Sequence, residues 1–205
     1  MYAGQPDMTT EILSSPYRAA TPRDAEAMAE LVNIAGEGLP LHLWTKMAGE
    51  GESPWEVGRQ RAQRKSGGFS YCNTIVHEED NSVVAALIGY PLPDAPEPVD
   101  YRELPEMFVP LQQLEDLVPG TWYINVLAAY PKHRGKGYGT GLLTVAEEIA
   151  AQEGCRGLSL IVSDGNPRAR QLYMRSGYQE ITSRTMVKGS WENAGENWVL
   201  LRKAL

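Results

Sequence analysis

Apolar positions along the first third of the chain recur at helical spacing. Residues 21–36 begin with Thr21 followed by proline, which suits an N-cap and a first helical position, and apolar side chains then return every three to four residues. This pattern predicts a helix that ends near Gly36. A second helix is predicted for residues 53–65, with Ser53 as its cap and Glu56 bonding back to the cap amide.

The pattern changes to strand-like runs after residue 70. Residues 71–77 and 83–90 are strand-like runs joined by the polar segment 78–81, which predicts an antiparallel hairpin. Residues 91–106 contain five prolines and many acids, so we expect no regular element there. This segment is interpreted as a long excursion across the surface, and long loops of this kind often carry function.

The second half of the chain has the strongest periodic signals. Residues 122–129 form an apolar run bounded by Gly120 and Pro131, as expected of a buried central strand. A glycine-rich turn follows, and then a helix is predicted from about Gly137 to Gln152. Shorter elements are expected after it: a strand at 158–162, a helix at 166–176, and closing strands at 178–188 and 198–202.

This order of elements predicts a mixed α/β fold of the α+β type, in which helices flank a mainly antiparallel sheet of about six to seven strands. Residues 16–205 are expected to form a single domain. Residues 1–15 are small and polar without a periodic pattern, and we interpret them as a flexible N-terminal leader.

Composition excludes several classes of protein. The formal net charge of −7 argues against a general nucleic-acid binder. No apolar run approaches the ~18–20 residues of a membrane span, and the N-terminus lacks the basic-then-apolar order of a secretory signal. We therefore expect a cytoplasmic protein without nucleic-acid or membrane partners.

The cysteines and histidines predict no metal site and no disulfide framework. Two cysteines, Cys72 and Cys155, show no metal-ligand spacing with the three histidines. They are interpreted as reduced structural thiols.

The segment with the clearest candidate chemistry is the turn at residues 134–139, which lies between the predicted central strand and the amphipathic helix. Glycines there allow close approach of a ligand, and free amides at a helix start attract anions, so a phosphate site is one interpretation. A tight strand-to-helix connection is the other. A P-loop and a dinucleotide fingerprint both require spacings that this turn lacks.

Two blocks of sequence resemble the Gcn5-related N-acetyltransferase (GNAT) family. Arg134, Gly137 and Gly139 occupy the marked places of the family pattern (Arg or Gln)-x-x-Gly-x-(Gly or Ala), and residues 127–131 resemble its strand end. Residues 166–178 resemble the family's Asn-x-x-Ala-x-x-Leu-Tyr-x-x-x-Gly-(Phe or Tyr), a strand and a helix downstream. The resemblance implies the GNAT fold and an acetyl-CoA-dependent N-acetyltransferase.

The resemblance also implies where acetyl-CoA binds. Backbone groups of the strand end would pair with the pantetheine arm like an added strand, and amides of residues 135–140 would hold the pyrophosphate. The expected contacts are Leu127, Ala128, Ala129, Arg134, Gly135, Lys136, Gly137, Tyr138, Gly139, Thr140 and Asn166.

Family roles carry over to two residues of the second block. Tyr173 matches the tyrosine that protonates the leaving CoA thiolate, although a packed aromatic at a helix end is the alternative. Asn166 matches an asparagine that hydrogen-bonds the pantetheine region, and it is equally suited to cap the helix that begins with Pro167. Both roles of Asn166 are compatible.

The proton acceptor does not follow from the resemblance. Many family members have a glutamate where this chain has Ile161, which cannot accept a proton. Tyr123 and Asn125 alternate on one strand face with Leu127, so they are candidates to organise a water that takes the amine proton. The alternative is that Tyr123 only packs.

The expected reaction is direct attack of a primary amine, on a small molecule or a protein, on the acetyl-CoA thioester. A catalytically weak acyl-CoA-binding regulatory module with the same fold is the alternative, motivated by Ile161. Acidic residues between Asp94 and Asp116 either attract a cationic amine or only solvate the excursion. Many relatives dimerise, so a homodimer is one arrangement that the resemblance allows.

Overall fold

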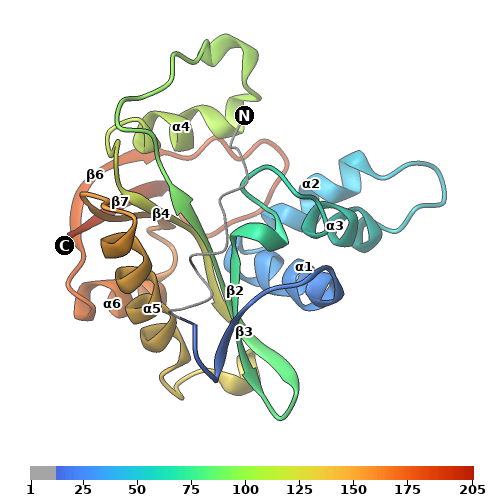
Figure 1. Cartoon of the computed structure of the whole chain (residues 1–205). Helices are drawn as coiled ribbons and strands as arrows, with labels where there is room; N and C mark the ends of the chain where they lie inside the picture. The colour runs from blue at the N-terminus through green and yellow to red at the C-terminus, as the bar shows by residue number, and fades with distance from the viewer. Residues whose placement is uncertain (1–12) are drawn as a thin grey trace. The chain divides into compact units, whose positions relative to one another are not determined.

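The computed structural model describes residues 13–205, and their strands form a seven-stranded sheet flanked by helices (Figure 1). The strands are β1 (Tyr17–Ala19), β2 (Thr74–Glu79), β3 (Ser82–Pro91), β4 (Trp122–Ala129), β5 (Gly157–Ser163), β6 (Gln179–Thr185) and β7 (Asn197–Ala204). Their order in the sheet is β1-β2-β3-β4-β5-β7-β6, in which β4–β5 is parallel and the β1–β2, β2–β3, β5–β7 and β6–β7 pairs are antiparallel. This architecture confirms the predicted fold class. Residues 1–12 of the predicted leader lie outside the described part of the chain.

The chain forms two compact units. Unit 1 contains the described residues up to Tyr90 together with Asn125–Val145. Unit 2 contains Pro91–Ile124 and Ala146–Leu205. The strand β4 and the helix α5 (Tyr138–Gln152) contribute residues to both units.

The first helix of unit 1 ends where predicted, but the turn after the expected cap Thr21 is 3₁₀. A 3₁₀ turn at Pro22–Asp24 leads into α1 (Ala25–Ala35), and the Asp24 carboxylate accepts the Thr21 amide at 2.7 Å. Gly36 ends the helix. Met28 and Leu31 are buried on its inner face, as the helical spacing predicts. The preceding strand, β1, covers Tyr17–Ala19.

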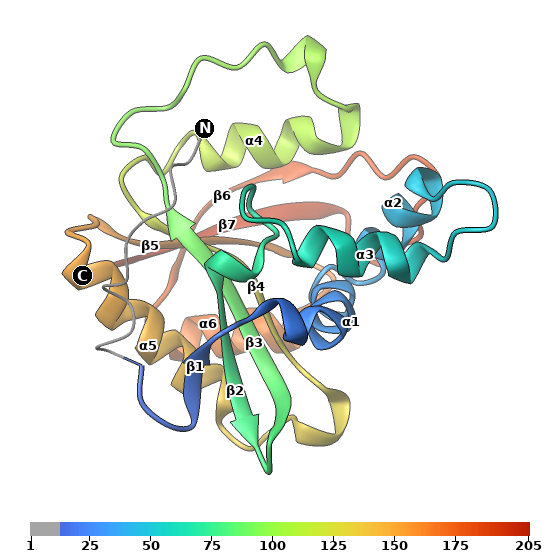
Figure 2. The ribbon, with the colours of Figure 1, turned by 45° about the vertical axis from the view of Figure 1, so that its right-hand side comes forward.

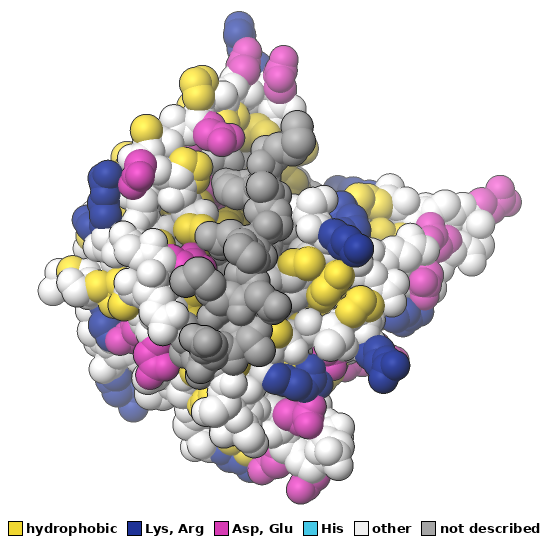
Figure 3. Space-filling view, viewed as in Figure 1, with side chains coloured by type: hydrophobic (Ala, Val, Ile, Leu, Met, Phe, Trp, Pro, Cys, Tyr) yellow, Lys and Arg dark blue, Asp and Glu magenta, His cyan; other side chains and the backbone are white. Residues whose placement is uncertain are grey.

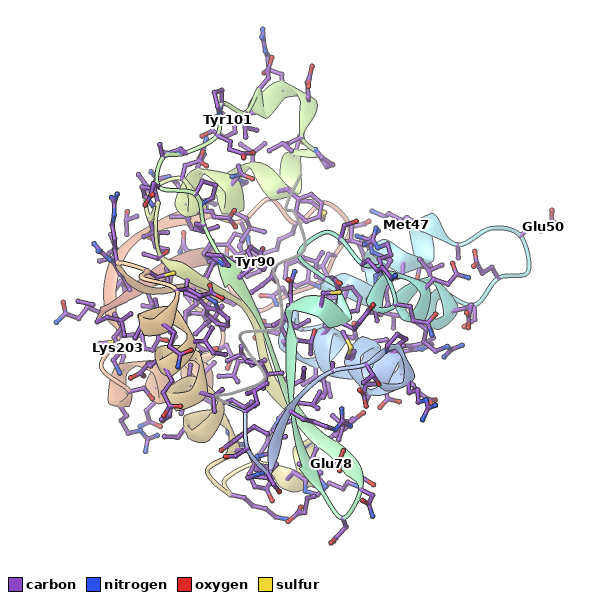
Figure 4. The ribbon with its side chains drawn as sticks, viewed as in Figure 1. Met47, Glu50, Glu78, Tyr90, Tyr101 and Lys203 are labelled. Atoms are coloured by element: carbon purple, nitrogen blue, oxygen red, sulfur yellow. The ribbon has the colours of Figure 1, made fainter. Side chains whose placement is uncertain are left out.

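The helix α2 (Leu39–Met47) was not predicted, because Gly36, Gly38 and Pro40 form a cluster of helix breakers. Pro40 lies in the first turn, where the missing amide leaves no hydrogen bond unmade. The tertiary packing of α2 on α1 and α3 favours a helix here. Acidic side chains line the segment that projects after α2 (Figure 3), with Glu50 at its tip (Figure 4).

The helix α3 (Pro54–Ala62) starts as predicted, but its expected capping box is absent. Ser53 makes no side-chain cap hydrogen bond, and the Glu56 carboxylate instead pairs with Arg59 at 2.7 Å. The helix packs on α2 through Gly58, because a Cβ there would lie 2.6 Å from the Trp44 ring. The helix also ends at Ala62, three residues earlier than predicted.

The predicted hairpin is formed by β2 (Thr74–Glu79) and β3 (Ser82–Pro91), visible in Figure 1. Asp80 and Asn81 make the turn, with φ of 50° and 57°. Residues 71–73 were expected to begin the first strand, but they form a 3₁₀ turn. The reason is local, because the Ser70 hydroxyl accepts the Cys72 amide at 3.1 Å.

In unit 2 the excursion after β3 contains a helix that was not predicted, α4 (Val109–Glu115), with 3₁₀ turns at 101–103 and 106–108 before it. The helix runs beside β6 and β7 (Figure 2). Several acids of the excursion have partners within the unit: the Tyr101 hydroxyl donates to Asp116 at 2.5 Å, and Arg156 pairs with Asp94 at 3.3 Å.

Glu115 makes the stability of unit 2 depend on pH. Burial, with a smaller contribution from the neighbouring Asp116, raises the pKa of Glu115 from 4.5 to about 7. The folded state therefore keeps a proton that the unfolded state loses, and stability falls as pH rises from about 4.5 through about 7. We expect Glu115→Gln to raise the unfolding free energy at pH 8 by up to about 3 kcal/mol, and to leave it nearly unchanged at pH 4.5.

The measurement for Glu115 is urea unfolding of wild type and variant at the two pH values. Glu106→Gln removes one exposed carboxylate from the same excursion and controls for net charge. A stability difference that is equal at pH 4.5 and pH 8 would contradict the expectation.

The first four strands and α-helices after residue 120 lie close to their predicted bounds. They are β4 (Trp122–Ala129), α5 (Tyr138–Gln152), β5 (Gly157–Ser163) and α6 (Pro167–Arg175). The closing strands differ more: β6 covers Gln179–Thr185, and β7 covers Asn197–Ala204. Residues 186–188 were expected in a strand, but they belong to the loop that connects β6 to β7.

Candidate functional site

The glycine turn between β4 and α5 lies in unit 1 and is open to a ligand. A 3₁₀ turn at Pro131–His133 is followed by Gly135 and Gly137, whose φ values of 80° and 89° lie in the left-handed region. A Cβ at either glycine would meet no described atom within 4 Å. An α-helix leaves its first amides without partners inside the helix, so the start of the 15-residue α5 fits an anionic group.

One carboxylate connects both ends of this turn. Glu79, the last residue of β2, accepts the Tyr138 hydroxyl at 2.9 Å and lies 3.1 Å from His133 Nδ1 and 3.4 Å from Lys136 Nζ. The hydrogen bond from Tyr138, together with Lys136 and His133, lowers the pKa of Glu79. Glu79 thus holds the side chains of a turn whose backbone is made flexible by glycine.

Aromatic packing supports the same turn. The His77 ring stacks on Tyr138 at 4.1 Å between centroids, and Tyr17 contacts the His77 ring edge-on at 5.1 Å. Burial lowers the pKa of His77, which favours the neutral imidazole at physiological pH. Its Nδ1 is buried and has no hydrogen-bond partner among residues 13–205.

Gly141 is the point where β1 meets α5. A Cβ at Gly141 would overlap the Tyr17 hydroxyl, which packs against the first turn of the helix. We expect Gly141→Ala to destabilise the protein by about 1–3 kcal/mol, because an added methyl would displace Tyr17. Adding Tyr17→Phe removes the overlapping hydroxyl, and we expect it to recover most of the loss in thermal unfolding. Equal losses in the single and double variants would contradict this contact.

The strand end before the turn is held by side chains as well. Arg134 Nε donates to the Ala129 carbonyl at 3.3 Å, and the Tyr130 hydroxyl donates to Glu30 at 2.5 Å. Leu127 and Ala129 are partly exposed, and Ala128 is buried. The two residues expected to pair with the pantetheine arm therefore face away from the core.

Asn125 is the exposed polar residue on the unit 1 part of β4. Its Nδ2 donates to the Tyr90 hydroxyl at 2.9 Å, and Tyr90 lies near the end of the neighbouring β3 (Figure 4). The backbone at Gly68 lies over both groups, because a Cβ there would be 3.0 Å from the Tyr90 hydroxyl and 3.3 Å from Asn125 Nδ2. With its amide nitrogen oriented by Tyr90, Asn125 keeps a carbonyl oxygen that can accept from a water.

Tyr123 lies in unit 2 and differs from Asn125 in exposure. Tyr123 is 7% exposed as a residue, whereas Asn125 faces solvent. Tyr123 is opposite Ser159 in the parallel β4–β5 pair. Ser159 in turn shares a buried 2.7 Å hydrogen bond with Thr121, so this end of the pair is tightly packed.

The second block of the motif forms α6 in unit 2. Asn166 caps the helix by accepting the Ala169 amide at 3.0 Å, as its capping role predicts. Tyr173 is buried, and its ring contacts Tyr178 edge-on at 5.8 Å. Burial raises the pKa of Tyr173, so the phenol keeps its proton at neutral pH. Ile161 on β5 is partly buried.

Three residues near the candidate groups were missed in the sequence. Glu79 and His77 were assigned only to the hairpin, and Tyr90 only to the end of a strand. No local spacing connects Glu79 with Tyr138, which is 59 residues away. The sequence carries no signal for this contact, because a carboxylate beside a hairpin turn is ordinary and predicts nothing about a distant glycine turn.

Residues 13–205 contain no group of three or more His, Cys, Asp or Glu side chains arranged for a metal ion. None of the helices in this part of the chain combines the length and the apolar composition of a membrane span. Cys72 and Cys155 are both free thiols.

The sequence matches a known family over more than half of its length. The family described as "Acetyltransferase (GNAT) family" matches residues 40–178. Bovine thialysine N-epsilon-acetyltransferase is 37% identical over 60 residues, which are 29% of this chain and 35% of that protein. The uncharacterized N-acetyltransferase YhfO of Bacillus subtilis (strain 168) is 39% identical over 61 residues, 30% of this chain and 41% of YhfO. These matches thus span well under half of the curated relatives.

The similarity to solved structures extends over most of the chain. A crystal structure of an acetyltransferase superposes with a TM-score of 0.64 at 21% identity, covering 93% of this chain and 99% of the other. At this identity the likeness establishes the fold.

Proposed function

Because this chain belongs to the GNAT acetyltransferase family, we propose that it transfers an acetyl group from acetyl-CoA to a primary amine of a small molecule or a protein. One observation carries the proposal: Gly135 and Gly137, both within the 134–139 turn, have left-handed backbone and open space around them just before α5. Such a turn presents backbone amides to a pyrophosphate without side chains in the way.

The cosubstrate is bound mainly by backbone in this proposal. Amides of residues 135–140 hold the pyrophosphate, and the partly exposed Leu127 and Ala129 pair with the pantetheine arm as an added strand would. The Ala128 backbone belongs to the same strand end and contributes to orienting the thioester. Glu79 supports binding indirectly, because it restrains the Lys136 and Tyr138 side chains of the turn.

The reaction is direct attack. The amine nitrogen forms a bond to the thioester carbonyl carbon, the carbon–sulfur bond breaks, the amine loses one proton, and the CoA sulfur gains one. Tyr173 supplies the proton to sulfur, since a phenol that burial keeps neutral donates without carrying a charge into the site. Asn166 holds the start of the helix that carries Tyr173.

The amine proton leaves through a water in this proposal. Ile161 cannot accept it, and the carbonyl oxygen of Asn125, oriented by the Tyr90 hydroxyl, is the better candidate to hold such a water. Tyr123 is buried on the same strand and supports the position of β4 rather than meeting bulk solvent. Its hydroxyl is the alternative ligand for the water.

A second candidate function is an acyl-CoA-binding regulatory module without efficient turnover. Ile161 motivates it, because a carboxylate would be the simplest proton acceptor at that position. Such a module keeps the glycine turn, so this hypothesis predicts tight CoA binding without formation of product.

The discriminating experiment combines thermal shift with CoA release. We expect acetyl-CoA to raise the melting temperature, and at least one amine to give CoA release above background. The amine panel contains polyamines, aminoglycosides, amino acids, N-terminal peptides and thialysine. A thermal shift without turnover over the whole panel would favour the regulatory module, and a shift with nucleotides but not with CoA would overturn both candidates.

A further inference from the structure

The loop between β6 and β7 is fastened to the turn that precedes α6, entirely within unit 2. Two glycines make this close approach sterically feasible. A Cβ at Gly165 would lie 2.5 Å from the Gly195 amide nitrogen, and a Cβ at Gly195 would overlap the Ser163 hydroxyl and lie 2.9 Å from Asp164 Oδ1. Backbone therefore lies on backbone here, with no room for a side chain.

Asp164 makes the main polar contacts of this junction. Its carboxylate accepts the Glu196 amide at 2.8 Å and the Asn197 side-chain amide at 2.9 Å, and its own amide donates to the Asn197 carbonyl at 3.0 Å. Burial acts to raise the pKa of Asp164, but the hydrogen bonds from Asn197, Glu196 and Gly165 outweigh it and lower that pKa. The carboxylate is therefore ionised at neutral pH, and its hydrogen bonds are charge-assisted.

The loop side of the junction is itself ordered. Asn193 Oδ1 accepts the Gly195 amide at 2.7 Å, and Lys188 Nζ donates to the Asn193 carbonyl at 3.1 Å. Trp191 stacks on Trp198 with 10° between the ring planes. These contacts order the loop, and an ordered loop holds Asp164 in place. A flexible loop would move together with Asp164 and would not restrain it.

The other side of the junction is the start of α6. Asn166 donates its amide to the Ser163 carbonyl at 3.1 Å and caps the helix through Ala169. The helix has only nine residues, so a shift of its first turn reaches Tyr173 within two helical turns. Tyr173 is seven residues beyond Asn166, roughly 10 Å along the helix axis.

We propose that Asp164 is a positioning residue for Tyr173: it ties the start of α6 to the 193–197 segment and so fixes where the Tyr173 hydroxyl lies. This inference rests on the proposed function, in which Tyr173 donates the proton to sulfur. Misplacement of a reacting group by about 1 Å costs up to about 10²-fold in rate, so a support at the start of a short helix has kinetic consequences.

The test compares Asp164→Ala with wild type in steady-state kinetics, using the best amine from the screen. We expect kcat to fall about tenfold while the KM for acetyl-CoA stays within about twofold. In a Tyr173→Phe background the same substitution has little further effect, because the group that it positions is gone. Additive losses in the double variant, or an unchanged kcat in Asp164→Ala, would overturn the proposal.

Exchanging the residues at positions 164 and 197 distinguishes a positioning role of Asp164 from a general loss of stability. Asp164→Asn alone loses the charged acceptor, whereas Asp164→Asn combined with Asn197→Asp restores an amide–carboxylate hydrogen bond in reverse. We expect the pair to recover most of the lost kcat, and failure to recover it at wild-type melting temperature would count against the proposal. Glu192→Gln removes an exposed carboxylate from the same loop and serves as the control. Asp164→Asn carries the test if Asp164→Ala does not fold.

If the wild type shows no turnover, the proposed function is refuted. The effect of Asp164 on α6 is still measurable in that case. Amide hydrogen exchange then reports on α6 directly. If the α6 amides exchange faster in Asp164→Ala while the β4 amides are unchanged, the junction stabilises α6 as proposed. Unchanged exchange in α6 overturns it.

Discussion

Tyr173→Phe is expected to lower kcat by about 10²–10⁴-fold while leaving the KM for acetyl-CoA within a few-fold. The substitution removes only the hydroxyl, and the ring contact with Tyr178 remains. Without a proton donor the CoA thiolate must leave unprotonated or take a proton from water. The measurement is steady-state CoA release with the best amine acceptor.

Tyr178→Phe is the matched control for this result. Tyr178 is a second buried tyrosine in contact with Tyr173, and its hydroxyl has no hydrogen-bond partner in the described part of the chain. Removing that hydroxyl leaves no partner unsatisfied, so we expect unchanged kcat and equal or greater stability. Similar losses of kcat in both variants would indicate a packing effect. Wild-type turnover in Tyr173→Phe would exclude Tyr173 as the general acid.

Gly137→Ala is expected to weaken binding of acetyl-CoA by about 10–100-fold. Gly137 has φ of 89°, which an alanine adopts only at a cost, and its Cβ would project into the open space before α5. The turn would have to shift, and its amides would no longer converge on the pyrophosphate. Isothermal titration with CoA measures the change directly.

Gly154→Ala controls for backbone strain in this experiment. Gly154 follows α5, has φ of 69° and has open space around its missing Cβ, so the two substitutions impose similar local strain. We expect Gly154→Ala to lower the melting temperature without changing the dissociation constant for CoA. Equal affinities of Gly137→Ala and wild type would remove the turn from the proposed binding site.

Sequence patterns located the central strand, the glycine turn and the helices α5 and α6 almost to the residue. They succeed there because burial and helix caps are local signals: β4 is an apolar run between Gly120 and Pro131, and Asn166 followed by proline starts α6. They predicted neither α2 nor α4, both of which contain a proline in the first turn, and packing favours a helix in each.

Candidate residues divide in the same way. Tyr173, Asn166 and the turn glycines are legible because motifs record residue types at fixed spacing along the chain. Glu79 and Asp164 are not, because each acts through partners that are distant in sequence, such as Tyr138 and Asn197. The opposite error occurs at Ser53, where the local capping motif predicts a contact that the structure lacks. Ser53 makes no side-chain cap hydrogen bond, and Glu56 pairs with Arg59 instead.

The sequence by itself determined the fold class, the family resemblance and the positions of the glycine turn and Tyr173, since these depend on periodicity and short-range spacing. Only the tertiary structure decided that Glu79 restrains that turn, that Tyr90 orients Asn125, and that Asp164 anchors the start of α6. The physical reason is that a hydrogen bond acts over about 3 Å, whatever the separation of its two residues along the chain.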